Sequence, residues 1–314
     1  MTKKLAQTAV LLLCLLALIS ILSCEVNGPA GEAETSAPYS HEPSVTPTSE
    51  PSLVHTAETD SPSEDTPPPT SPPVKTPVLP TREKICAKYA EMTPSVWGEA
   101  MVGIVSVLPT DSKVVAITLD ACGWGAGSGY DKPLIDFLVT ENIPATLFIS
   151  GKWIEDNPGE IEYLASFEFF EIENHGYLHR PLSVTGRSQY GIKGTGSVAE
   201  VYDEIENNAR RIEDLTGRRP IFFRAGTAYY DDVAVKIAAD LGQTIAGYTI
   251  AADGGASFSA QQILNVCKDP ENGAILLFHM NHPESDTCEG IKAVYRALTK
   301  KGYAFVRLED YNIF

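Results

Sequence analysis

From Lys113 onward, short apolar and β-branched segments alternate with amphipathic ones, and this rhythm most constrains the fold of the chain. Short apolar runs are typical of buried strands, and the longer amphipathic segments between them are typical of helices. Strands that alternate with helices predict a parallel β/α architecture. We expect seven strands, at Val114–Leu119, Ala145–Ile149, Phe169–Ile172, Ile221–Phe223, Gln243–Tyr248, Ala274–Phe278 and Ala304–Leu308.

The segments between these strands carry helix start and end signals. Between residues 198 and 215, apolar residues recur every three to four positions, as on one face of a helix. Ser197-x-x-Glu200 resembles a capping box at its start, and Gly217 stands where a C-terminal glycine is favoured. The same signals recur at Ser259-x-x-Gln262, Gly242 and Gly302. Seven strands suit an incomplete or distorted barrel better than a regular eight-fold one.

Polar residues stand where five of the apolar runs end. In parallel β/α barrels, the chemistry collects at the carboxyl ends of the strands. A buried strand has no other reason to end repeatedly in a charged or titratable side chain. We therefore expect a functional site built from Asp120, His175, Arg224, Asp253 and His279.

Four of the six histidines lie in two short clusters at such strand ends, at 175–179 and 279–282. The other two, His41 and His55, lie in a segment rich in proline and threonine. Histidine is a common metal ligand and exchanges protons near neutral pH. This concentration indicates a metal-assisted or acid–base site.

The first 24 residues resemble a bacterial lipoprotein signal peptide. Two lysines precede an apolar run, Val10–Leu22, which is short for a membrane-spanning helix and is followed by Ser23 and Cys24. Cys24 would then be the lipidated first residue and would tether the protein to a membrane. The alternatives are an uncleaved anchor and plain secretion. All three place the folded domain outside the cytoplasm, at the cell surface or in the periplasm.

A linker is expected at residues 25–82, because this segment holds more than half of the 22 prolines and cannot bury enough apolar surface to fold. The folded domain then spans 83–314, with its motif-bearing core at 113–308. The formal charge of −17 argues against nucleic acid as a partner. We expect a monomer. Of the four cysteines in the domain, Cys267 and Cys288 are one possible disulfide pair.

Over about 113–308 the chain resembles the NodB-homology polysaccharide deacetylases, carbohydrate esterase family 4. The segments that match the family's motifs are Thr118–Gly123, His175-x-x-x-His179, Arg224–Tyr230, Ala252–Gly255 and Leu277–His279. The resemblance implies a distorted (β/α)7 barrel. It also implies metal-dependent hydrolysis of N-acetyl groups on an amino-sugar polymer, such as a cell-wall glycan.

The family pattern assigns roles to these residues. It implies that His175 and His179 bind a divalent ion, which we expect to be zinc, and that Asp120 is the general base. His279 would donate a proton to the leaving amine, while Arg224 and Asp253 complete the catalytic set. In the first motif, Ala121 stands where the family has a carboxylate that binds the metal.

Three arrangements can compensate for Ala121. Asp120 can itself become a metal ligand, which is the arrangement we favour. Alternatively, Cys122 can supply a thiolate, since side chains two apart on a strand face the same way. Finally, a site of two histidines and additional water can persist. Two histidines at i and i+4 reach one ion if their segment forms a helical turn.

Structural roles are the alternative for each of these residues. His279 can be a core histidine, Asp120 a helix cap, and Arg224 with Asp253 an ion pair. His282 and Cys122 are expected to be incidental. The aromatic residues near the strand ends can stack on sugar rings or simply pack: Trp124, Tyr177, Tyr229 and Tyr230. At the level of function, the alternatives are a glycan-binding pseudoenzyme on the same fold and a hydrolase of another non-peptide C–N bond.

Overall fold

The computed structural model describes residues 79–313. The expected signal peptide, Cys24 and nearly all of the expected linker lie outside these residues. Helix α2 (Arg82–Tyr89) begins at the last linker residue, with Thr81 as its cap, and Arg82 forms an ion pair with Asp203. Across 79–313, no helix is both long enough and apolar enough to cross a membrane.

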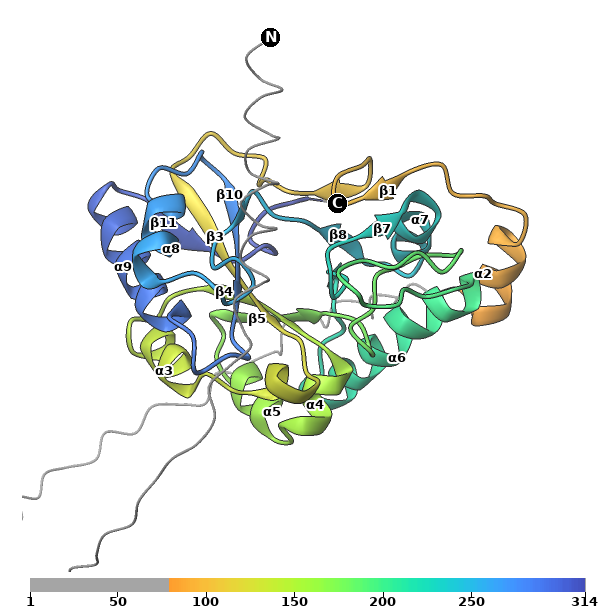
Figure 1. Ribbon diagram of the computed structural model, residues 1–314, viewed down its shortest axis with the longest axis horizontal. Helices are drawn as coiled ribbons and strands as arrows, with labels where there is room; N and C mark the ends of the chain where they lie inside the picture. The colour runs from red at the N-terminus through yellow and green to blue at the C-terminus, as the bar shows by residue number, and fades with distance from the viewer. Residues whose placement is uncertain (1–78, 314) are drawn as a thin grey trace, which may run out of the picture. The chain divides into compact units, whose positions relative to one another are not determined.

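A single nine-stranded sheet forms the centre of the domain, and every strand pair in it is parallel. The strand order is β2-β8-β6-β5-β4-β3-β10-β9, with β11 beside the first half of β3. The sheet curls, and the helices pack around its outer face (Figure 1). The strands are β2 (Ile104–Val105), β3 (Val114–Ala121), β4 (Ala145–Ile149), β5 (Phe170–Asn174), β6 (Phe222–Phe223), β8 (Thr244–Ala246), β9 (Ile250–Ala251), β10 (Ala274–His279) and β11 (Ala304–Val306).

All seven expected strands are present, and the expected distorted β/α barrel is confirmed. The prediction missed β2 and β9, and also the small antiparallel pair of β1 (Trp97–Gly98) and β7 (Tyr230–Asp231). Each of these strands has only two residues, which is too short to show a periodic pattern. The helices after α2 are α3 (Lys132–Thr140), α4 (Gly151–Asp156), α5 (Glu160–Ala165), α6 (Val198–Thr216), α7 (Asp232–Asp240), α8 (Ala260–Cys267) and α9 (Thr287–Lys300).

The expected helix starts and ends are confirmed, but the capping box at Ser197 is incomplete, because the Glu200 carboxylate accepts from the Gly196 N–H instead of the Ser197 N–H. Ser197 caps α6 by accepting a hydrogen bond from the Glu200 N–H, and Gly217 ends that helix with a φ of 72°. Ser259 and Gln262 form a capping box at α8. These caps satisfy N–H and C=O groups that a helix end otherwise leaves without partners.

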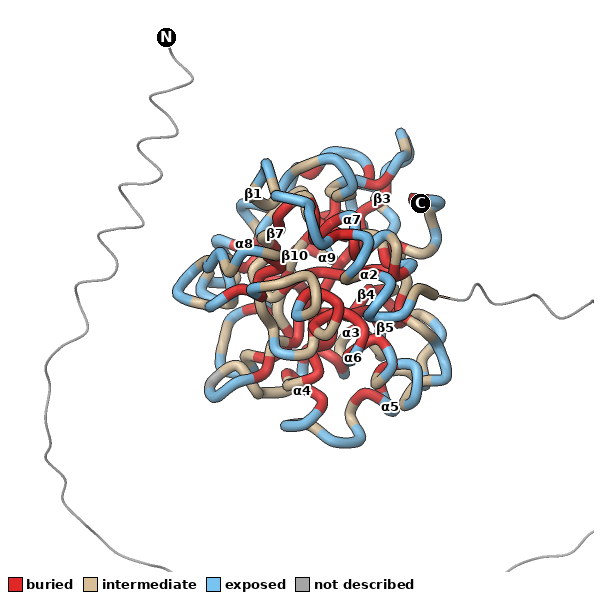
Figure 2. Tube along the Cα trace, turned by 90° about the vertical axis from the view of Figure 1, so that its right-hand side faces the viewer, coloured by how far each residue is buried: buried red, intermediate tan, exposed pale blue. Residues whose placement is uncertain are grey.

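Strand β3 separates two layers of the core. Its odd-numbered side chains, from Val115 to Ala121, join the apolar cluster between the sheet and the helices. Val114 and Ala116 belong to a second cluster with Phe148, and Thr118 and Asp120 follow on the same face because strand side chains alternate. Buried residues accordingly concentrate in the strands (Figure 2). The face that ends in Asp120 is thus the face that can build a site.

The disulfide considered for Cys267 and Cys288 is wrong. Both residues are buried in the cluster between the sheet and the helices, and both thiols are free. Cys86 and Cys122 are also unpaired among the described residues.

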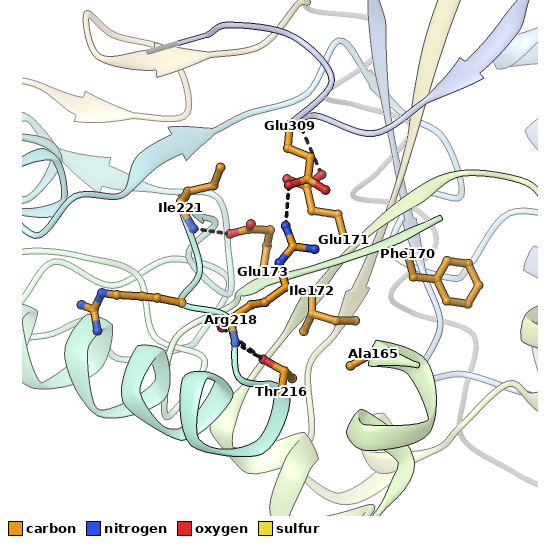
Figure 3. Close-up of a pocket in the computed structure, with 10 residues that line it drawn as sticks. Ala165, Phe170, Glu171, Ile172, Glu173, Thr216, Arg218, Ile221 and Glu309 are labelled. Atoms are coloured by element: carbon orange, nitrogen blue, oxygen red, sulfur yellow. Dashed lines mark hydrogen bonds and ion pairs between the residues drawn. The ribbon is translucent and has the colours of Figure 1, made fainter. Parts of the chain in front are cut away.

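Two buried glutamates of β5 lie beside a small cavity of about 60 Å³ away from the strand-end residues (Figure 3). Glu171 is 1% exposed, and one of its carboxylate oxygens accepts hydrogen bonds from Thr146 Oγ1 and the Leu308 N–H. Its other oxygen is buried and has no hydrogen-bond partner within residues 79–313. Burial raises the pKa of Glu171 to about 7 and raises that of Glu173 well above its usual value.

This raised pKa predicts a pH-dependent stability. A carboxyl group whose pKa is higher in the folded state stabilises the fold fully below its unfolded pKa of about 4.3, and this contribution is lost as pH rises to about 7. The free energy of unfolding should therefore fall between about pH 5 and about pH 8, and Glu171→Gln should reduce that fall by roughly 2–3 kcal/mol. Urea unfolding at these two pH values measures the free energy of unfolding. The exposed control Glu162→Gln should leave the fall unchanged; an equal fall in parent and Glu171→Gln would contradict the prediction.

Candidate functional site

The parallel sheet brings the expected polar residues to one edge. His279, the last residue of β10, pairs directly with Asp120 of β3. His175 and Arg224 each follow the final residue of a strand, β5 and β6, which are themselves paired. Asp253 follows β9 by two residues and contacts His279. Parallel pairing places these carboxyl ends together, so residues more than 150 positions apart in sequence meet at one rim.

His175 is fixed through one ring nitrogen, and its other ring nitrogen faces the site. Its Nδ1 lies 2.9 Å from the carbonyl oxygen of Arg224, which can only accept, so Nδ1 carries the hydrogen. Nε2 then presents its lone pair, 3.6 Å from Asp120 Oδ2 and 3.7 Å from Cys122 Sγ. Burial lowers the pKa of His175, which keeps the ring neutral. A neutral imidazole held in this way is what a metal ligand requires.

His179 lies beside it, with ring centroids 4.9 Å apart. Its Nε2 is buried and has no hydrogen-bond partner among the described residues. Burial lowers the pKa of His179 to about 3, so the ring is neutral. A buried polar nitrogen without a partner is costly unless a ligand satisfies it. The two imidazoles therefore fit a bound cation.

Residues 175–179 do not form the helical turn that would let histidines at i and i+4 reach one ion. The segment is an irregular loop with positive φ at Gly176 (80°) and His179 (55°). The buried carboxylate of Glu204 holds it by accepting hydrogen bonds from the N–H groups of Leu178 and Arg180. The loop, rather than helical spacing, brings the two rings together.

Arg224 is completely buried and orients Asp120. One of its terminal nitrogens donates to Asp120 Oδ1 at 2.8 Å and to Thr118 Oγ1 at 2.9 Å. Its other donors reach the carbonyl oxygens of Ala246 and Gly247. Burial raises the pKa of Asp120, but the charges of Arg224 and His279 lower it below its usual value. The carboxylate is thus kept ionised, with Oδ2 turned toward His175.

Asp253 and His279 form a second pair. Asp253 Oδ1 lies 2.9 Å from His279 Nδ1, and its Oδ2 accepts from the His279 N–H and from Thr287 Oγ1. Burial lowers the pKa of His279, but the two carboxylates of Asp253 and Asp120 raise it above its usual value. The ion pair of Arg224 with Asp253 that the sequence left open is wrong, because each has a different partner.

Cys122, which was expected to be incidental, lies beside the two histidines. Within the described part of the chain, one set of three donors meets with all ligand atoms within 4.8 Å of one another: Cys122, His175 and His179. Asp120 borders this set without joining it. Burial and the nearby carboxylates of Asp120 and Asp253 raise the pKa of the Cys122 thiol well above its usual value. Ala121 is fully buried in the apolar cluster and faces away.

A cavity of about 610 Å³ opens beside these residues. Cys122, His179 and His279 contribute to its wall, with Trp124, Arg180 and Lys193 toward the outside. A neighbouring cavity of about 400 Å³ shares His279 and includes Asp120, Tyr190 and Tyr248. Two cavities that meet at His279 can hold an extended ligand across the rim.

Of the aromatic residues proposed to stack on sugars, Trp124 is 55% exposed beside the larger cavity and is placed to do so. Tyr230 is fully buried and accepts a hydrogen bond from the Ala225 N–H, so stacking by this ring is excluded. Tyr229 packs against Trp97, and the Tyr177 hydroxyl binds Glu155. His282 pairs with Glu284 at the edge of the larger cavity.

Sequence reasoning missed three supporting residues. Glu204 was detectable, because it interrupts the apolar stripe of α6 between Val201 and Ile205, where a charge is unexpected. Thr118 stood in a matched motif without an assigned role, and Thr287 carried no such signal, since threonine is common at helix starts.

The chain resembles known proteins in both sequence and fold. The sequence model of the polysaccharide deacetylase family matches residues 108–246. A peptidoglycan-N-acetylglucosamine deacetylase of Listeria monocytogenes is 26% identical over 246 residues, which cover 76% of this chain and 48% of the relative. This chain therefore spans about half the length of that protein.

Solved structures share the fold. A carbohydrate esterase family 4 pseudoenzyme from Bacillus anthracis has a TM-score of 0.56 and 22% identity over 71% of this chain and 70% of its own. A mutant of that pseudoenzyme is described as having restored activity. A family 4 acetyl xylan esterase from Clostridium thermocellum, solved with a cobalt ion, has a TM-score of 0.50 and 24% identity over 63% of this chain and 89% of its own. Residues 108–246 thus match the polysaccharide deacetylase family in sequence, and the domain shares the fold of solved carbohydrate esterase family 4 proteins.

Proposed function

We propose that this domain is a metal-dependent hydrolase that removes N-acetyl groups from an amino-sugar polymer. The observation that carries the proposal is the meeting of two neutral imidazoles, one buried and one half-buried, with two charge pairs beside an open cavity. One pair joins Asp120 to Arg224, and the other joins Asp253 to His279. The sequence match of residues 108–246 to the polysaccharide deacetylase family supports the reaction.

His175 and His179 would hold the ion, since His179 Nε2 has no hydrogen-bond partner among the described residues and His175 Nε2 faces the Cys122 thiol and the Asp120 carboxylate. When bound, a divalent cation lowers the pKa of a coordinated water and polarises the amide carbonyl. The cobalt ion in the related acetyl xylan esterase is consistent with such a site. We propose zinc as the resident ion, because imidazole ligands suit it.

Asp120 would act as the general base. Arg224 fixes one of its oxygens and leaves Oδ2 directed toward His175, where a nucleophilic water would lie. That water attacks the amide carbonyl carbon and gives its proton to Asp120. Catalysis of this kind contributes about 10²–10⁴-fold in rate.

His279 would act as the general acid. Asp253 holds its Nδ1–H and raises its pKa, which favours the protonated ring, whose Nε2–H can be donated. As the C–N bond breaks, the amine of the sugar takes this proton and acetate leaves. Thr287 keeps Asp253 in place, which fixes the orientation of the ring.

The substrate would be a cell-wall glycan. The Listeria relative is described as acting on peptidoglycan, and the exposed Trp124 ring at the cavity offers a face on which a sugar can stack. Such a polymer lies outside the cytoplasm, which agrees with the proposed signal peptide. A lipid on Cys24 would then tether the domain to the membrane near its substrate.

The second candidate function is a glycan-binding pseudoenzyme. It is favoured by Ala121, which is buried in the apolar cluster where the family has a carboxylate. The Bacillus anthracis relative of the same fold is described as a pseudoenzyme. Acetate release from N-acetylated chito-oligosaccharides and peptidoglycan fragments by the metal-loaded chain separates the two functions.

Replacing His175 or His179 with alanine is expected to cut the bound metal at least about tenfold, because a lost ligand costs no less than a lost supporting contact. Elemental analysis of the purified chain measures the metal, and acetate release measures the activity. His282→Ala is the matched control: it removes an imidazole from the same cavity, but one paired with Glu284. Full metal in both His175→Ala and His179→Ala would place the ion elsewhere.

A further inference from the structure

We propose that Cys122 is the third protein ligand of the metal, so that a two-histidine, one-thiolate site replaces the family's arrangement in this chain. The inference rests on the proposed metal site and deepens it. It also leaves Asp120 as the general base and not as a metal ligand.

The geometry of β3 selects Cys122 over its neighbour. Ala121 points into the apolar cluster and is fully buried there. The next side chain, Cys122, reaches the histidines, with Sγ 3.7 Å from His175 Nε2. A carboxylate in the sequence position of Ala121 is therefore not what completes the site. The residue after it supplies the donor.

The backbone around Cys122 is held in place. Its carbonyl oxygen accepts a hydrogen bond from Ser150 Oγ at 2.6 Å. Gly123 follows with a φ of 78°, and a Cβ there would lie 2.7 Å from the backbone nitrogen of Trp153. The turn after β3 thus needs a glycine at 123, and it fixes the direction of the thiol.

The distances fit a tetrahedral ion. With zinc–sulfur and zinc–nitrogen bonds of about 2.3 and 2.05 Å at tetrahedral angles, the sulfur and nitrogen ligands lie about 3.6 Å apart. The observed separation of Cys122 Sγ and His175 Nε2 is 3.7 Å, and all three donors lie within 4.8 Å of one another. Three protein ligands leave the fourth position open for water, as in catalytic zinc sites.

The other uses of this thiol do not fit its surroundings. Cys122 forms no disulfide, and its only recorded side-chain partner among the described residues is His175. A thiolate ligand selects zinc or cobalt over magnesium or calcium, which take oxygen ligands.

Cobalt substitution tests this directly. The full chain, freed of metal and loaded with one equivalent of Co²⁺ without oxygen, should show a near-ultraviolet thiolate-to-cobalt charge-transfer band. Cys122→Ser should abolish the band and weaken Zn²⁺ binding at least about tenfold. Cys86→Ser, which alters a thiol on α2, should keep both properties. Asp120→Asn should also keep the band.

The outcomes separate this inference from the proposed function. Cobalt bound by the parent without the band, or a band that persists in Cys122→Ser, overturns the thiolate ligand and leaves the hydrolase standing. A band that depends on Cys122 in a chain that releases no acetate supports the ligand and overturns the hydrolase. Binding of cobalt that requires Asp120 and not Cys122 returns the third position to the carboxylate and overturns the inference.

Discussion

Replacing Asp120 with asparagine is expected to lower the rate of acetate release by about 10²–10⁴-fold while leaving the bound metal in place. Asparagine keeps the shape of the side chain, and its amide oxygen can still accept the hydrogen bond from Arg224. It cannot take a proton from water, so only the base is removed. Steady-state hydrolysis and elemental analysis of the same preparation measure the two properties.

The control for this change is Asp156→Asn, which alters a partly exposed carboxylate on α4 that pairs with Lys152. It should leave the rate within about twofold, because it touches none of the proposed reacting groups. Unchanged turnover in Asp120→Asn would remove Asp120 from the chemistry. Loss of metal together with turnover would instead make Asp120 a ligand, the arrangement that the sequence favoured.

The sequence predicted the architecture because the long central strands are apolar and regular. Strands β3, β4 and β10 match their predicted spans to within two residues, and the caps of α6 and α8 follow from local hydrogen-bond chemistry. The short strands were missed because their conformation is set by neighbouring strands rather than by a pattern of their own. Thr249, for example, links the start of β10 to Ser106 through its hydroxyl and backbone N–H.

The site was predictable as a set of strand ends but not as a set of contacts. Parallel pairing alone brings Asp120 beside His279. Which carboxylate Arg224 or His279 binds depends on how far each side chain extends across the barrel. Arg224 reaches Asp120, and His279 reaches Asp253. The loop at 175–179 depends on Glu204, 25 residues after His179, so its shape could not follow from the spacing of the two histidines.

Arg224 joins three strands through one buried side chain. Its guanidinium stacks 4.2 Å above the Phe148 ring of β4 while it binds Asp120 on β3 and carbonyl groups at the end of β8. A buried charge with this many partners is stable only while all of them remain. The residue therefore couples the position of the proposed base to the closure of the sheet at its carboxyl end.

Arg224→Met is expected to lower the free energy of unfolding by roughly 3–5 kcal/mol. Methionine fills much of the same volume and keeps contact with Phe148, so the loss comes from the polar groups left behind. Those are the Asp120 carboxylate, the Thr118 hydroxyl and the carbonyl groups of Ala246 and Gly247. Urea unfolding followed by circular dichroism measures the change.

A double-mutant cycle shows whether the loss belongs to the pair. In Asp120→Asn/Arg224→Met the buried negative charge is absent, so the combined loss should be smaller than the sum of the two single losses. Arg296→Met, on the exposed face of α9, is the matched control and should change the free energy of unfolding by less than about 0.5 kcal/mol. Strict additivity of the two losses would mean that Arg224 stabilises the barrel independently of Asp120.

In Arg224→Met alone, burial is no longer opposed by the guanidinium, so the pKa of Asp120 rises and hydrolysis should need a higher pH than in the parent.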